Sequence, residues 1–277
     1  MGQTESVDIV RYIGDEKNSI TDNVIIEYPL TIFVNGEELV TLLCTPIDLK
    51  ELTIGFLFSE GFIKGVDDLE EFELDEKNGI AKVKTKSPVD FTKELFSKRT
   101  IASGCEKSAI FYNARDSLGQ RKVTSDTSIS SRVLIELNNS MQKASVLYRT
   151  TGGVHSAALC DTEKILSFKE DIGRHNALDK VLGDALLKDM PTNGKLILTS
   201  GRASSEIVVK SVRHGIAILV SRSAPTNLAV KIARQYSLTL IGFARGNRMN
   251  IYSHERRVKT LLHVILLFAI WILDFIC

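Results

Sequence analysis

Cysteine is scarce in this chain of 277 residues, and its spacing excludes two common kinds of site. The four cysteines are Cys44, Cys105, Cys160 and Cys277, and no two have the CxxC spacing of a zinc knuckle or a dithiol redox couple. The segment from Met1 to Gly14 is mixed and polar, unlike a secretory signal, so we expect a cytoplasmic protein. The cysteine spacing does not exclude a site that uses a single reactive thiol.

The sequence also lacks an excess of charge of either sign. It has 35 basic and 34 acidic residues, which predicts no general affinity for nucleic acid and restricts any anion site to a local cluster. Neither GxxxxGK[ST] nor GxGxxG occurs, so the usual P-loop and dinucleotide fingerprints are absent. A hydrophobic content of 44% is ordinary for a globular protein with a real core.

Long hydrophobic runs are absent except at the C-terminus, from Leu261 to Cys277. These 17 residues lie at the lower limit of about 17 to 25 for a spanning helix, and Asp274 interrupts them. Three interpretations stay open: a helix packed on this chain or a partner, a membrane contact, and an aberrant or disordered end.

The first half of the chain predicts an N-terminal α+β domain over residues 1–125. Two apolar stretches flank the turn sequence Asn35-Gly36, which indicates a β-hairpin. Helical spacing of apolar residues follows, and then strand-like alternation. The expected elements are strands at Asn23–Tyr28, Leu30–Val34, Glu38–Cys44 and Ile80–Thr85, and a helix at Asp48–Phe62.

From residue 126 the pattern changes to alternating helices and strands, which is typical of an α/β layered sheet with crossover helices. We expect this domain to cover residues 126–258 and the hydrophobic extension to cover 259–277. The expected helices are Val133–Tyr148, Asn176–Leu187, Ser204–His214 and Thr226–Tyr236. The expected strands are Ala157–Leu159, Ile165–Phe168, Lys195–Thr199, Ile216–Val220, Thr239–Ala244 and Met249–Tyr252.

Cys105 is the candidate nucleophile. It follows Gly104 in a polar stretch that a core cysteine would not normally occupy, and Lys107 and backbone NH groups can favour its thiolate. The alternative is a loop thiol without a function.

A second candidate segment contains Gly152, Gly153 and His155. The glycines permit close approach of a ligand, and the imidazole can act as acid, base or hydrogen-bond donor. A structural histidine beside a strand is the alternative. Six ionisable residues in Glu170–Lys180 indicate either an anion-binding helix start at Arg174 or a capped surface helix.

Arginines follow three expected strands. Arg202 and Arg222 each precede a helix N-terminus, and the strand end Phe243–Arg248 (Phe243, Ala244, Arg245, Gly246, Asn247, Arg248) is a third case. Ligands of open α/β sheets collect at the carboxyl ends of strands, where helix N-termini favour anions. Ordinary helix capping is enough to explain the serine and threonine hydroxyls of these loops. It does not explain the arginines, which favour a phosphorylated ligand.

With these segments assembled, the chain resembles the FdhD family, the accessory sulfurtransferases of formate dehydrogenase. The resemblance runs from about Glu27 to Val258, and its motifs include SGC at 103–105, TGGVH at 151–155, EDIGRHNALDK at 170–180, SGRAS at 200–204, SRSAPT at 221–226 and GFARG at 242–246.

The resemblance implies that Cys105 receives persulfide sulfur from a cysteine desulfurase. It also implies transfer of this sulfur to the bis(molybdopterin guanine dinucleotide) form of the molybdenum cofactor, destined for the formate dehydrogenase catalytic subunit. The loops with Phe243–Arg248, Arg202, Arg222, Gly152, Gly153 and His155 would hold this cofactor, and the family suggests a homodimer. A non-catalytic chaperone that only binds the cofactor is the alternative.

The family also implies a cytidine-deaminase-like three-layer fold for the C-terminal domain, with a smaller N-terminal α+β domain. Ala157 stands where a zinc deaminase needs glutamate, and no PCxxC follows, so we expect no zinc and no deamination. Ser108 stands where some members have a second cysteine, so a CxxC-dependent mechanism is excluded. The extension 259–277 has no counterpart in the resemblance.

Overall fold

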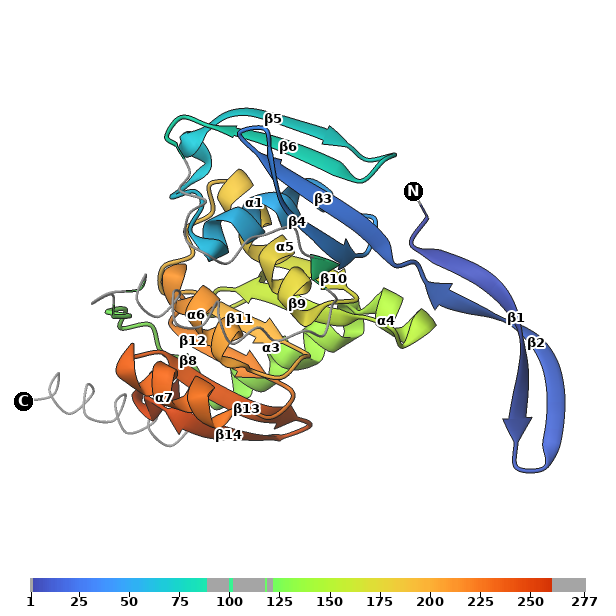
Figure 1. Ribbon diagram of the computed structural model, residues 1–277. Coiled ribbons are helices and arrows are strands. Elements are labelled where there is room, and N and C mark those ends of the chain that lie inside the picture. The colour runs from blue at the N-terminus through green and yellow to red at the C-terminus, as the bar shows by residue number, and fades with distance from the viewer. Residues whose placement is uncertain (1, 89–99, 102–117, 119–121, 261–277) are drawn as a thin grey trace, which may run out of the picture. The chain divides into compact units, whose positions relative to one another are not determined.

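The computed structural model describes residues 2–88, 100–101, 118 and 122–260, and the chain divides into two compact units (Figure 1). Unit 1 consists of Met1–Tyr112, Ser145–Ser156 and Lys169–Met190, and unit 2 of Asn113–Ala144, Ala157–Phe168 and Pro191–Cys277. The predicted domains, 1–125 and 126–258, are each continuous in sequence, whereas these two units are not. The later segments Ser145–Ser156 and Lys169–Met190 group with the N-terminal part of the chain. The units are described separately below.

Unit 1 contains a five-stranded sheet in the order β5-β6-β3-β4-β7. Its strands are β3 (Tyr28–Val34), β4 (Glu37–Cys44), β5 (Leu69–Asp75), β6 (Ile80–Thr85) and β7 (Thr100–Ile101). The hairpin predicted between β3 and β4 is confirmed, because Asn35 and Gly36 have φ values of 51° and 88°, as a two-residue hairpin turn requires. Alternate residues of β3, such as Leu30 and Ile32, are fully buried, so one face of the sheet forms the core.

Helix α1 (Leu49–Glu60) confirms the helix predicted here, and it packs against α5 (Arg174–Leu187). The two backbones nearly touch, since a Cβ atom on Gly55 would lie 1.9 Å from the carbonyl oxygen of Asp179. A Cβ atom on Gly183 would lie equally close to the carbonyl oxygen of Glu51. Only glycine fits at these two positions, and η1 (Val66–Asp68) then leads from the helix layer to β5.

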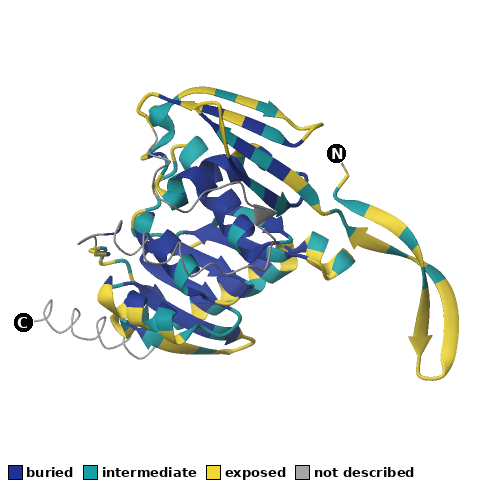
Figure 2. Ribbon diagram, in the orientation of Figure 1, coloured by how far each residue is buried: buried dark blue, intermediate teal, exposed yellow. Residues whose placement is uncertain are grey.

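A long hairpin precedes this sheet and was not predicted. Strands β1 (Thr4–Ile13) and β2 (Glu16–Ile25) pair antiparallel over ten residues each and form a separate two-stranded sheet. We call this hairpin the arm. Most of its residues are exposed (Figure 2), and without a buried face its sequence does not alternate regularly between apolar and polar residues.

The single helix predicted over Val133–Tyr148 is wrong. Helix α3 (Ser131–Ala144) belongs to unit 2, and α4 (Val146–Thr151) belongs to unit 1. Ser145 separates them with ψ near 73°, outside the helical range, and its hydroxyl hydrogen-bonds to that of Ser156 at 2.8 Å. A buried side-chain hydrogen bond thus fixes a break that apolar periodicity does not reveal.

Unit 2 is built on a six-stranded sheet in the order β10-β9-β11-β12-β13-β14. The strands are β9 (His155–Cys160), β10 (Ile165–Asp171), β11 (Leu196–Thr199), β12 (Ile218–Ser221), β13 (Thr239–Arg245) and β14 (Arg248–Ser253). The other elements are α3, α6 (Ser205–Arg213), α7 (Asn227–Gln235), η2 (Glu255–Arg257) and the paired short strands β8 (Ile129–Ser130) and β15 (Val258–Lys259).

The central strands β11, β12 and β13 are parallel, and β9 and β14 flank them antiparallel. Every residue of β11 and β12 is buried (Figure 2), as expected of parallel strands covered on both faces. The α/β class predicted from the sequence is confirmed. Among the described helices, none combines the length and apolar character needed to cross a membrane, and the extension after residue 260 lies outside the described residues.

Candidate functional site

Two of the four cysteines are described, and both are inaccessible. Cys44 and Cys160 have no exposed surface, and burial raises the pKa of each thiol to about 12. Neither thiol forms a thiolate readily at neutral pH, and neither is open to a partner protein. Cys105, the predicted nucleophile, lies outside the described residues.

The segment Glu170–Lys180, which was predicted either to bind an anion or to form a surface helix, contains a buried ion pair. Nζ of Lys180 lies 2.7 Å from Oδ2 of Asp171, and both side chains are fully buried. The surface-helix interpretation is wrong, because most of α5 is buried within unit 1. The many charged residues of this segment did not predict a buried ion pair, since charged side chains are usually exposed.

Hydrogen bonds complete the surroundings of Asp171. Oδ2 accepts from the backbone NH and the hydroxyl of Thr45 at 2.9 and 3.0 Å, and Oδ1 accepts from Gly173 N and Asn176 Nδ2 at 2.8 and 2.9 Å. Lys180 also donates to the Thr45 hydroxyl at 2.6 Å. This cluster holds the start of α5 against the end of β4 inside unit 1, and sequence reasoning missed Thr45 entirely.

In unit 2, three loops follow the parallel strands at the same edge of the sheet. The loop after β11 contains Arg202, the loop after β12 contains Arg222, and Arg245 is the last residue of β13, directly before the turn to β14. Because β11, β12 and β13 run in one direction, their carboxyl ends lie side by side. The first two loops lead directly into the N-termini of α6 and α7.

Backbone hydrogen bonds join these loops into one surface. Arg222 N donates to Thr199 O at 3.0 Å, and Phe243 N donates to Ser223 O at 3.0 Å. Ala203 and Pro225 form an isolated parallel bridge. The three loops therefore hold one another in place, and a ligand bound here would meet a preformed surface.

The arginines give this surface its charge. Arg202, Arg245 and Arg248 are exposed, Arg222 is half-buried, and Nε of Arg245 donates to the carbonyl oxygen of Arg222 at 2.7 Å. None of the loops 200–204, 222–226 and 243–248 contains an acidic residue. Guanidinium groups beside helix N-termini suit phosphate groups, which is the chemistry predicted from the sequence.

The C-terminal part of β13 is strained. Phe243 has φ of 53°, a conformation that costs a bulky side chain free energy, and a β-bulge lies between Gly242 and Arg245. A buried amide supports the bulge, since Asn138 Nδ2 donates to the carbonyl oxygen of Ala244 at 3.0 Å. Strain of this kind concentrates at functional sites, and it adds a structural signal that the sequence did not give.

Gly152, Gly153 and His155 belong to unit 1, whereas the arginine loops belong to unit 2. Gly152 ends α4 with φ of 67°, and a Cβ atom on Gly153 would lie 2.8 Å from Ile25 of β2. His155 is half-buried at the start of β9. Helix termination and packing thus explain both glycines, and a ligand role for the three residues stays a prediction.

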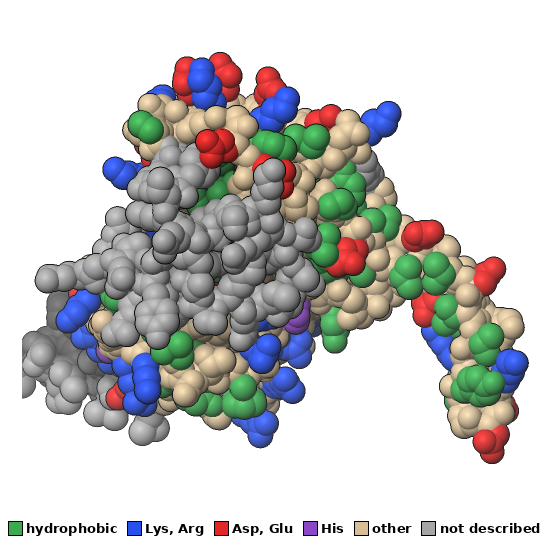
Figure 3. All heavy atoms as spheres, viewed as in Figure 1, with side chains coloured by type: hydrophobic (Ala, Val, Ile, Leu, Met, Phe, Trp, Pro, Cys, Tyr) green, Lys and Arg blue, Asp and Glu red, His purple; other side chains and the backbone are tan. Residues whose placement is uncertain are grey.

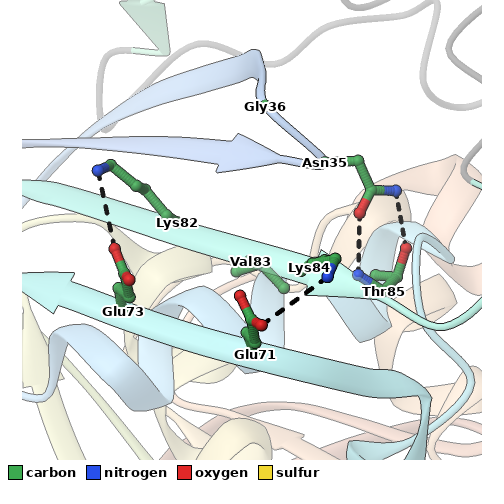
Figure 4. A pocket seen from close by; sticks show the side chains of 8 residues that line it. All are labelled: Asn35, Gly36, Glu71, Glu73, Lys82, Val83, Lys84 and Thr85. Atoms are coloured by element: carbon green, nitrogen blue, oxygen red, sulfur yellow. Dashed lines mark hydrogen bonds and ion pairs between the residues drawn. The ribbon is translucent and has the colours of Figure 1, made fainter.

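A groove of about 580 Å³ lies elsewhere on unit 1 (Figure 4). It is lined by residues of β5 and β6, including Thr85, and by Asn35 and Gly36 of the turn between β3 and β4. Its exposed walls carry ion pairs of Lys82 with Glu73 at 3.7 Å and of Lys84 with Glu71 at 3.8 Å. These charges compensate one another, and none of the predicted site residues lines the groove. Within the described part of the chain, no three His, Cys, Asp or Glu side chains are grouped to hold a metal ion.

Comparison with known proteins agrees with this architecture. The family model described as "FdhD/NarQ family" matches residues 25–259. A Bacillus subtilis protein named sulfur carrier protein FdhD is 42% identical over 252 residues, which cover 91% of this chain and 96% of that protein. A Bacillus pumilus protein of the same name is 45% identical over 238 residues, covering 86% and 91% respectively.

A solved structure is also similar. It is described as a formate dehydrogenase accessory protein from Desulfotalea psychrophila, and it aligns with a TM-score of 0.77 and 25% sequence identity. The alignment covers 93% of this chain and all of the other. With the matched family model and relatives above 40% identity over most of its length, the chain belongs to the FdhD/NarQ family.

Proposed function

We propose that this chain is a sulfur carrier for the maturation of formate dehydrogenase, and that Cys105 holds the transferred sulfur as a persulfide. The inaccessibility of Cys44 and Cys160 carries this proposal, because it leaves Cys105 and Cys277 as the remaining candidates for the sulfur-carrying thiol. Of these two, Cys105 has the glycine and lysine neighbours that favour a thiolate. The names of the relatives support the same function.

In the proposed first step, the Cys105 thiolate attacks the outer sulfur of a persulfide on a cysteine desulfurase. The sulfur–sulfur bond of the donor breaks, the donor cysteine leaves as a thiolate, and Cys105 becomes a persulfide. No oxidant is needed, since the outer sulfur already has the required oxidation state. In the second step an electron-rich atom of the acceptor bonds to the outer sulfur and supplies both electrons of the new bond. The sulfur–sulfur bond breaks, and Cys105 leaves as a thiolate.

The proposed acceptor is the bis(molybdopterin guanine dinucleotide) cofactor, which is the substrate and is delivered afterwards to the formate dehydrogenase catalytic subunit. The arginine loops of unit 2 suit its phosphate groups, because Arg202, Arg222 and Arg245 lie at the carboxyl ends of parallel strands. We place this chemistry in the cytoplasm, where a reducing environment keeps single thiols free.

The test is intact-mass spectrometry of the full chain after incubation with a cysteine desulfurase and cysteine. We expect a gain of one sulfur, about 32 Da, which a thiol reductant removes. Cys105→Ala should abolish the gain. The matched control Cys277→Ala should retain it.

Equal loading of the Cys105→Ala protein would contradict the proposal. So would the absence of loading on the wild type when the same donor loads a known acceptor. Either result would favour the second candidate, a chaperone that binds the cofactor through the arginine loops without carrying sulfur. That candidate predicts full nucleotide binding by Cys105→Ala.

A further inference from the structure

A single amide side chain lies among apolar ones on the buried face of α3. The buried residues of this helix are Leu134, Leu137, Asn138 and Met141, and Asn138 is 2% exposed. Its Nδ2 donates to the carbonyl oxygen of Ala244 on β13 at 3.0 Å. Its Oδ1 is buried and accepts no hydrogen bond from the described part of the chain. An asparagine placed in this way destabilises the fold, because a buried acceptor without a donor has lost its bonds to water.

The carbonyl group that Asn138 satisfies belongs to the β-bulge of β13. Between Gly242 and Arg245 the register with β14 shifts, so the two residues between them lie opposite a single residue of β14. Ala244 is one of these two and is only 5% exposed. A buried carbonyl group needs a donor, and the amide of Asn138 supplies one from a different element.

The same bulge is connected to the loop that contains Arg222. Arg245 directly follows the bulged residues, and its Nε donates to the carbonyl oxygen of Arg222 at 2.7 Å. Within the bulge, the backbone nitrogen of Phe243 donates to the carbonyl oxygen of Ser223 at 3.0 Å. Bulges of this kind change the direction of nearby side chains. The conformation of the bulge therefore determines how Arg245 lies relative to loop 222–226.

The backbone at Phe243 needs support to keep this conformation. Its φ of 53° is unfavourable for a bulky side chain, so the backbone returns to negative φ unless neighbouring contacts prevent it. The bond from Asn138 to Ala244, the next residue, is such a contact. Without it, the Ala244 carbonyl group would turn toward water, Phe243 would relax, and Arg245 would move away from Arg222.

The surface that this bulge shapes is basic. Lysine and arginine side chains gather at the end of unit 2 that contains β13 and β14, and acidic side chains are few on the face shown (Figure 3). Arg245 and Arg248 are both exposed there. Guanidinium groups bind phosphate strongly when their geometry permits a bidentate contact. A bulge that is fixed before a ligand arrives favours binding, because the ligand does not have to order it.

We propose that Asn138 is a positioning residue for phosphate binding at the arginine loops and that it acts through the backbone of the bulge. The inference rests on the proposed function, which places the phosphate groups of the client cofactor at these loops. Asn138 is too deeply buried to touch a ligand. It holds the Ala244 carbonyl group, and thereby Phe243 and Arg245, in the conformation that receives an anion. The buried Oδ1 without a donor is a loss of stability that accompanies this function.

The first test is Asn138→Leu, because leucine is similar in size and suits an apolar site but cannot donate. We expect the dissociation constant for guanosine diphosphate, used as the probe, to rise at least tenfold by calorimetry, about the loss of one charge-assisted hydrogen bond. The midpoint of urea unfolding should stay unchanged or rise, because the buried acceptor is removed and apolar contacts are added. A purely structural asparagine predicts the reverse, a lower midpoint with unchanged affinity.

The matched control is Asn139→Leu. It makes the same chemical change one position along α3, at a half-buried residue on a different side of the helix. This variant should bind guanosine diphosphate with the affinity of the wild type. A loss of affinity as large as that of Asn138→Leu would show that any leucine on this helix disturbs the site, and it would overturn the proposal.

The second test asks whether Asn138 acts through Arg245. In a double-mutant cycle, Asn138→Leu should raise the dissociation constant at least tenfold in the wild type but no more than about threefold in Arg245→Gln. The reason is that the displaced guanidinium group is already absent from the second background. Effects of the two substitutions that simply multiply would overturn the proposal.

Failure of this inference and failure of the proposed function give different results. If the wild type does not bind guanosine diphosphate, the arginine loops are not the phosphate site, and the inference is wrong together with that part of the proposed function. If the wild type binds and Asn138→Leu binds equally well, only the inference is overturned. Weaker binding by Asn138→Leu together with a lower unfolding midpoint also overturns it, because the asparagine then stabilises the fold.

Discussion

Replacing Lys180 by Met tests the buried ion pair of unit 1. Methionine has a similar length and is apolar, so it fills the space of the lysine stem but removes the charge. The substitution leaves Asp171 fully buried with its charge and four hydrogen-bond donors, but without the cation at 2.7 Å. It also removes the donor to the Thr45 hydroxyl.

Removing one partner of a buried pair typically costs about 3–5 kcal/mol, because an uncompensated charge remains in the interior. Here the remaining hydrogen bonds stabilise the carboxylate in part, so we expect a loss of about 3 kcal/mol in the free energy of unfolding. The matched control is Lys188→Met. Lys188 belongs to the same region and pairs with Asp184 at 2.8 Å, but its own side chain is 62% exposed. Lys169 stays 3.8 Å from the buried Asp184 after the substitution, so we expect a loss of only about 0.5 kcal/mol.

The assay is urea unfolding followed by circular dichroism, with the wild type and both lysine variants at pH 7. Hydrogen exchange resolved by mass spectrometry should show faster exchange in β4 and α5 of Lys180→Met, because both elements contribute to the cluster. Equal losses for Lys180→Met and Lys188→Met would refute the reasoning, since they would show that burial of the pair does not matter.

Two further predictions concern unit 2. Burial lowers the pKa of His214 to about 3, helped by the nearby charges of Lys210 and Arg213, so the unfolded chain binds the proton more readily. The stability contributed by neutral His214 is complete above pH 6.5 and is lost as pH falls toward 3. Between pH 7 and pH 5 we expect the unfolding free energy to fall by about 2 kcal/mol more in the wild type than in His214→Leu, and parallel pH curves would contradict this. For the arginine loops, Arg202→Gln should weaken binding of guanosine diphosphate at least tenfold by calorimetry, since a charge-assisted hydrogen bond contributes about 1.5–3 kcal/mol. The exposed Arg132→Gln, on α3, should leave the affinity unchanged, and equal affinities for both variants would count against these loops as the phosphate site.

Local signals in the sequence were enough for much of the fold. Asn35-Gly36 predicts its turn because few other residues tolerate positive φ at both positions. Helix α1 was predicted because its apolar residues recur at helical spacing. The parallel strands of unit 2 were predicted as short apolar runs, and their order placed the arginine loops at one edge of the sheet.

Other features depend on contacts between distant residues and could not be predicted. The arm has no buried face, so its strands lack alternation. The break at Ser145 depends on a bond to Ser156, and the burial of Lys180 depends on Asp171 and Thr45. The strain at Phe243 follows from a bulge supported by Asn138, a residue more than 100 positions earlier in the chain.

The discontinuity of unit 1 has a consequence for how the protein is made. A ribosome produces the sheet of unit 1 within the first 101 residues, but α5 is complete only at residue 187. Until then α1 lacks the helix against which Gly55 packs, and the apolar face of the growing sheet has no partner from α5. Nascent chains with exposed apolar surface are prone to aggregate.

Synthesis of these intervening residues takes about 4–17 s at typical bacterial rates, a long time compared with the folding of a small domain. Chains paused or truncated before residue 187 should therefore contain an incompletely folded unit 1 and bind chaperones. Chains released after residue 187 can complete the folding of unit 1, whether or not unit 2 is complete.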